Sequence, residues 1–183
     1  MAVPITVRLM ILEYIKNRFR ARALRKYAYS EATGLRPLRS VRTAAVLLDV
    51  QDQGFEPLKK QVLDWFRSHG IKAEPYYFDF RKIEKEEMLL TSMKTTYIRR
   101  ELNWYGSLSP ERIEPIVENR PFDLFISLVP DAEFPTKLLS SSMPASFKVG
   151  LCGYEGAPYD LVVSAPTPAQ GFGVITDILE KIQ

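Results

Sequence analysis

Residues 41–50 read VRTAAVLLDV and contain an uninterrupted apolar run from Ala44 to Leu48. A continuous apolar run, rather than an alternating one, is typical of a strand that is buried on both faces of a parallel sheet. After a short polar loop, apolar residues recur at helical spacing from Phe55 to His69, and Gly70 then suits the left-handed position that ends a helix. Residues 41–70 therefore predict a strand, a loop and a helix.

The alternation of strand and helix signals continues to the end of the chain. Four further buried strands are expected, and a less buried one at Tyr97–Tyr105. The predicted strands are 73–80, 122–129, 147–151 and 160–165, and the predicted helices are 84–94, a short one starting near Ser109, 134–142 and one capped by Thr167. This pattern predicts a three-layer α/β fold, Rossmann-like or flavodoxin-like, with a mostly parallel sheet covered on both faces.

Charge divides the chain into two parts. Residues 1–42 hold ten basic and two acidic residues, a net charge of +8, whereas the other 141 residues have a net charge of −5. Helical patterning from Ile5 to Tyr29 ends before a segment that contains Gly34 and Pro37. We therefore expect a basic helical arm at 1–33, a linker at 34–40 and a single α/β domain at 41–183.

The basic arm predicts a phosphate-rich or acidic partner. Its one apolar stripe is narrow, and its basic residues between 16 and 26 project in all directions, whereas a membrane-surface helix separates its charges from a broad apolar face. RNA, a ribosomal surface or an acidic protein is thus favoured over a membrane surface. A helix that packs on the body without an external partner is the alternative. The candidate binding residues are Lys16, Arg18, Arg20, Arg22, Arg25 and Lys26.

Acidic side chains are expected at one edge of the sheet. Asp49, Asp79 and Asp131 each follow a predicted strand, and the carboxyl ends of parallel strands share the edge at which such folds bind ligands. Together with Asp52, and with Trp104 as an apolar wall, they could bind a divalent cation or sugar hydroxyls. Aspartate is equally common at turns and helix caps, so the spacing also fits a structural role.

Motifs for catalysis or cofactor binding are missing from the sequence. It has no Gly-rich phosphate loop, no G-x-S-x-G and no His/Cys cluster, so no cofactor and no metal is predicted. The single Cys152 and the single His69 lie 83 positions apart, and one cysteine fits a reducing cytoplasm. No segment is apolar for long enough to span a membrane. A non-enzymatic interaction protein is favoured; the alternative is a small nucleotide- or sugar-binding domain, possibly a glycosyltransferase-like or other enzyme.

Three segments carry a resemblance to known proteins: WYG at 104–106, PFDLFIS at 121–127 and ASFKVG at 145–150. With them, the chain resembles an uncharacterised family of small bacterial proteins that have a basic N-terminal helix before a compact α/β domain. It departs from that family at residues 128–131, where the family tends to have a tyrosine-rich segment. Residues 122–151 also resemble, in part, the N-terminal domain of heptosyltransferase-like glycosyltransferases. Those enzymes take their nucleotide-sugar site from a second domain, so the resemblance transfers no activity.

Overall fold

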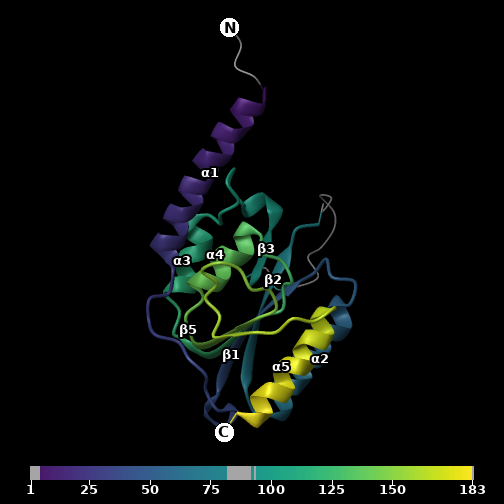
Figure 1. The fold of residues 1–183 in the computed structure, drawn as a ribbon. Coiled ribbons are helices and arrows are strands. Elements are labelled where there is room, and N and C mark those ends of the chain that lie inside the picture. The colour runs from purple at the N-terminus through teal and green to yellow at the C-terminus, as the bar shows by residue number, and fades with distance from the viewer. Residues whose placement is uncertain (1–4, 82–91, 93, 183) are drawn as a thin grey trace.

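The computed structural model describes residues 5–81, 92 and 94–182, with the backbone alone for residues 5–8 (Figure 1). The helix expected at 84–94 falls outside the described residues, apart from 92 and 94. None of the described helices is long and apolar enough to cross a membrane.

A sheet of six parallel strands forms the centre of the molecule. Its strand order is β3-β2-β1-β4-β5-β6, which is the Rossmann order and not the flavodoxin order. The expected α/β fold is confirmed, and the sheet is wholly parallel. The strands are β1 (Thr43–Asp49), β2 (Lys72–Asp79), β3 (Thr96–Ile98), β4 (Phe122–Ser127), β5 (Ala145–Gly150) and β6 (Leu161–Val162).

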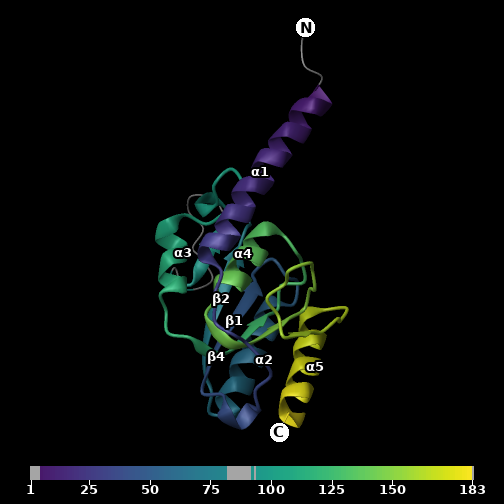
Figure 2. The same cartoon turned by 60° about the vertical axis from the view of Figure 1, so that its left-hand side comes forward.

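Helices cover both faces of this sheet. One face packs against α2 and α5, and the other packs against α3, α4 and the C-terminal half of α1 (Figure 2). The N-terminal half of α1 projects beyond the body. The α-helices are α1 (Ile5–Tyr27), α2 (Phe55–Ser68), α3 (Pro110–Val117), α4 (Phe134–Ser142) and α5 (Pro168–Lys181).

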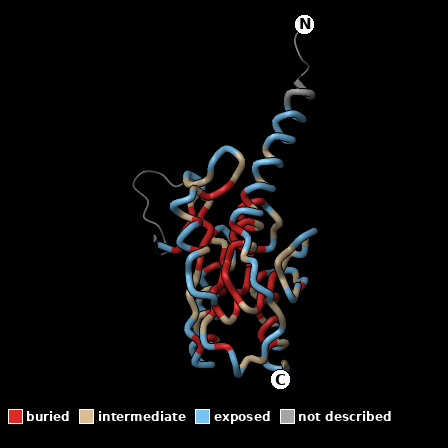
Figure 3. Tube along the Cα trace, turned by 90° about the vertical axis from the view of Figure 1, so that its left-hand side faces the viewer, coloured by how far each residue is buried: buried red, intermediate tan, exposed pale blue. Residues whose placement is uncertain are grey.

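The apolar run in β1 serves both layers. Val46 and Leu48 join the core under α2 and α5, whereas Ala45 and Leu47 face the core under α3 and α4. Successive side chains of a strand point to opposite faces, so a strand covered on both sides needs apolar residues at every position. Burial is concentrated in this central region, while the projecting half of α1 is exposed (Figure 3).

The largest departures from the expected elements lie at the sheet margin, where the strand expected at 160–165 is reduced to Leu161–Val162. The strand expected at Tyr97–Tyr105 ends at Ile98, because residues 99–101 form a 3-10 turn. The Glu101 carboxylate accepts a hydrogen bond from the Ile98 backbone N–H at 3.0 Å, which closes this turn. Helix α3 starts at Pro110 and keeps Pro115 inside it, and Gly70 has the expected positive φ of 67°.

Candidate functional site

The C-terminal half of α1 is docked on the body. Ala23 and Tyr27 are buried against the core of α3 and α4, and the Phe19 ring lies 5.4 Å from Trp104 and 5.5 Å from Tyr105 between centroids. The apolar stripe expected along the whole arm therefore makes contact only from Phe19 onward. Its earlier members, including Leu12, are exposed.

Three of the six candidate cations contact an acidic side chain or another element of the protein, whereas Arg25 donates only to the Ala21 carbonyl of its own helix at 3.3 Å. Lys16 Nζ lies 3.0 Å from a Glu13 carboxylate oxygen, and Lys26 Nζ lies 3.6 Å from one of Glu114. Arg20 donates from Nε to the Tyr105 carbonyl oxygen at 2.8 Å, and its guanidinium lies over the Phe134 ring. Arg20 therefore helps to fix the angle at which α1 leaves the body, since it joins the helix to the loop at Tyr105 and to the start of α4.

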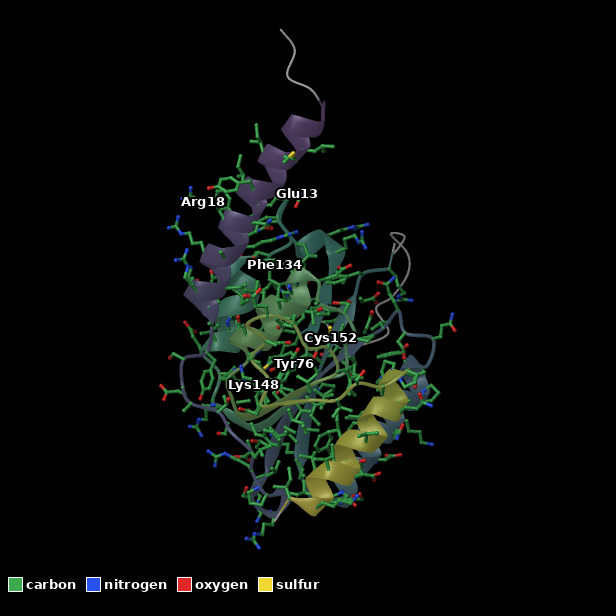
Figure 4. All side chains as sticks on the ribbon, in the orientation of Figure 1. Glu13, Arg18, Tyr76, Phe134, Lys148 and Cys152 are labelled. Carbon is green, nitrogen blue, oxygen red and sulfur yellow. The ribbon has the colours of Figure 1, made fainter. Side chains whose placement is uncertain are left out.

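The other three cations form a continuous basic surface, which we call the arginine face: Arg18, Arg22 and Arg25. All three are exposed, and within the described part of the chain none of them forms an ion pair. Their spacing of four and three places them within about 60° of one another around the helix and over roughly 10 Å of its length. Arg18 projects from the side of α1 opposite Glu13 (Figure 4). A shallow groove of about 420 Å³ runs along this surface, and Tyr14, Ile15 and Phe19 complete its lining.

A buried lysine anchors the segment that follows α1. Lys148 in β5 is 1% exposed, and its Nζ donates to the Ser140 carbonyl at 2.9 Å, in the last turn of α4. The ammonium also lies 5.4 Å from the centre of the Tyr29 ring, and Tyr29 N–H donates to the Ser141 carbonyl. A cation suits the carbonyl end of a helix. Burial nevertheless lowers the pKa of Lys148 to about 8, against the attraction of Asp160.

An aspartate anchors the other end of the same segment. Asp123 in β4 accepts hydrogen bonds from the backbone N–H groups of Arg42 and Thr43 at 2.8 and 2.9 Å, and from the Thr43 hydroxyl at 3.1 Å. Although partial burial opposes it, these hydrogen bonds lower the pKa of Asp123. The aspartate of the FDL segment and the lysine of the FKVG segment therefore both hold the connection between α1 and the sheet.

The aspartates expected at the carboxyl edge do lie within electrostatic reach of one another. Burial raises the pKa of Asp49, and the charges of Asp131, Asp52 and Asp79 raise it further, against a hydrogen bond from the Gln51 N–H. Asp49, Asp79 and Asp131 each have a local partner, however. Asp131 accepts from Glu133 N–H and from the Thr136 hydroxyl. Among the described residues, no three His, Cys, Asp or Glu side chains form a group that could hold a metal ion.

Asp79 and Trp104, the other predicted residues of this edge, also have partners within the protein. The fully buried Asp79 carboxylate accepts two hydrogen bonds from the Arg81 guanidinium at 2.7 and 2.8 Å. Trp104 packs on Phe19 of α1 and remains 53% exposed. A cavity of about 470 Å³ does lie beside this edge, but its polar lining comes from Arg20, Arg99 and Glu133, and none of the predicted aspartates lines it.

Sequence patterns alone did not single out two features of the site. Tyr14 accompanies the arginine face, and its signal is an aromatic residue within a basic stretch, whereas Phe19 beside it already belonged to the predicted apolar stripe. Lys148 is the other, and a lone lysine inside an apolar strand is an anomaly that indicates a specific partner.

The chain belongs to DUF6913, a family of unknown function, which it matches over residues 13–174. That match covers α1 from Glu13 onward together with the whole sheet. No curated protein and no solved structure matches the chain.

Proposed function

We propose that this protein is a non-enzymatic interaction protein that binds a phosphate-rich partner through the arginine face of α1. One observation carries this proposal: three exposed arginines share the outer side of α1, from its projecting half into its docked half, and no described acidic side chain pairs with them. The body serves as the scaffold, because Arg20, Lys148 and Asp123 fix the helix and its connection. The functional units are the arm at 1–33, the linker at 34–40 and the domain at 41–183. The proposed location is a reducing cytoplasm.

Phosphate is favoured over carboxylate as the group recognised. The guanidinium group offers a planar fork of donors that matches two phosphate oxygens, and it is more weakly hydrated than an ammonium group. Arginine occupies all three positions of the face, while both lysines of the arm are engaged elsewhere. RNA or a ribosomal surface supplies such phosphates, and an acidic protein surface is the other partner type that fits the charge.

The proposal predicts the salt dependence of binding to single-stranded RNA. Replacing Arg18, Arg22 and Arg25 by glutamine is expected to flatten the plot of log affinity against log salt by about two units, since each phosphate contact on a single strand contributes about 0.7. Fluorescence anisotropy with a labelled oligonucleotide at several salt concentrations measures this slope. Glutamine keeps the helix propensity close to that of arginine, so the fold is retained.

A charge-matched control separates the arginine face from net charge. Lys60, Lys72 and Lys181 are exposed on the body, and replacing all three by glutamine removes the same charge. This control should leave the slope nearly unchanged. Equal losses for the two triple variants, or an unchanged slope for the arm variant, would contradict a specific role of the arginine face.

A further inference from the structure

The projecting end of α1 is unusually apolar for an exposed helix. Six apolar side chains, which we call the apolar tip, precede the arginine face, and the most exposed are Met10 at 68% and Tyr14 at 64%. At about 100° per residue they point around the whole helix. The members of the apolar tip are Leu9, Met10, Ile11, Leu12, Tyr14 and Ile15.

Contiguous apolar exposure of this kind marks a binding surface. A helix that is apolar on all sides is normally buried in a core or in lipid. Phosphates along an RNA chain give such side chains no apolar environment, so RNA contact accounts for the arginine face but leaves the apolar tip in water. A partner that offers both apolar volume and phosphate satisfies both parts of α1.

We infer that the phosphate-rich partner is the surface of an anionic lipid bilayer. The apolar tip enters the boundary between headgroups and acyl chains, and the arginine face binds lipid phosphates beside it. This inference rests on the proposed function, because it uses the same three arginines. Residues 9–15 span roughly 9 Å of helix. If the tip enters end-on, it reaches a depth comparable with the roughly 5–10 Å to which the apolar face of an interfacial helix is buried.

From residue 9 onward, where the side chains of α1 are described, the unpaired charge separates along the helix axis, although charge does not separate around it. The apolar tip ends at Ile15 and the arginine face begins at Arg18, about 4.5 Å further along. Three other cations are directed to protein partners, so the sequence-based objection to a membrane surface, that charges surround the helix, no longer applies to the exposed face. Glu13, the acid within the tip, is paired with Lys16 at 3.0 Å.

Aromatic side chains lie at the transition between the two parts. Tyr14 is in the tip, and Phe19 packs on the half-exposed Trp104 from the loop after β3. Tyrosine and tryptophan are enriched where proteins meet the headgroup layer, because each combines an apolar ring with a polar group. Trp104 thus adds a half-exposed aromatic ring of the body beside this transition.

Co-sedimentation with lipid vesicles tests the inference. The full chain is expected to bind vesicles that contain phosphatidylglycerol and to bind pure phosphatidylcholine vesicles far less.

Glutamine at Arg18, Arg22 and Arg25 should weaken binding to phosphatidylglycerol vesicles about 100-fold, at roughly fivefold per arginine. Glutamine at Leu9, Met10 and Ile11 should weaken it at least about 100-fold, through the lost apolar transfer. Leu35 and Val174 are exposed apolar residues outside α1. As controls, glutamine at these two positions should change vesicle binding little.

The same variants are measured against single-stranded RNA, so that the outcomes can be distinguished. A tip variant that loses vesicle binding but keeps the RNA salt slope supports a lipid partner. Wild-type protein that binds RNA through the arginine face but ignores anionic vesicles overturns the lipid inference and leaves the proposed function standing, whereas failure to bind either overturns both. A tip variant that changes the oligomeric state in light scattering, with vesicle binding unaffected, also overturns the inference and assigns the tip to a second copy of the chain.

Discussion

The free energy of unfolding of the wild-type protein, relative to that of a Lys148→Met variant, is expected to rise by roughly 2.5 kcal/mol between pH 7 and pH 10. Burial lowers the pKa of Lys148 to about 8 in the folded state, from 10.5 for a lysine in water. Between these two values the unfolded chain binds more protons than the folded one, so stability increases with pH. The gain is complete above pH 10.5 and is lost as the pH falls through 8.

Urea unfolding of both proteins across this pH range measures the difference. Subtracting the methionine variant removes the contributions of other titrating groups, such as the buried tyrosines, whose raised pKa values act in the opposite direction. A Lys60→Met variant provides the control, since Lys60 is exposed and should give a curve parallel to that of the wild type. If the Lys148→Met and wild-type curves run parallel as well, Lys148 is not held in a buried site.

A second large effect is expected at Asp123. Replacing it by alanine should destabilise the protein by about 3 kcal/mol. The substitution removes the carboxylate and, with it, two hydrogen bonds from backbone N–H groups and one from a hydroxyl group. The bonds join β4 to Arg42 and Thr43, at the end of the connection from α1. Thermal or chemical unfolding gives the value, and Asp177→Ala on the exposed side of α5 should change stability by less than about 0.5 kcal/mol. Similar small losses for both variants would show that Asp123 does not anchor this segment.

Much of the fold could be predicted because local patterns and tertiary packing agree. The apolar run in residues 44–48 indicated a strand covered on both faces, and the helix 134–142 was expected with the bounds that α4 has. The end of β3 was not predicted, since a short 3-10 turn depends on the hydrogen bond from Ile98 to Glu101 and not on composition. The strand order also needed the structure, because alternation alone fits both Rossmann and flavodoxin arrangements.

The candidate site was less accessible from the sequence. Charge counting identified the basic arm, but the contacts that engage Arg20, such as its bond to Tyr105 85 positions away, are long-range and leave no local pattern. The separation of α1 into a docked half and a projecting half depends on where Phe19 meets Trp104. The aspartates at the sheet edge were expected to lie near one another and do interact electrostatically, yet turn and ion-pair partners account for Asp79 and Asp131.

Nuclear magnetic resonance of the arginine side chains tests most directly whether the outer surface of α1 is the binding site. The Nε–Hε signals of Arg18, Arg22 and Arg25 would be followed during titration with bicelles that contain phosphatidylglycerol, and separately with single-stranded RNA. We predict that these three signals shift together in at least one titration, while the backbone signals of Asp49, Asp79 and Asp131 remain in place. Shifts confined to the carboxyl edge, with the three arginine signals unmoved in both titrations, would contradict the account and assign binding to the sheet.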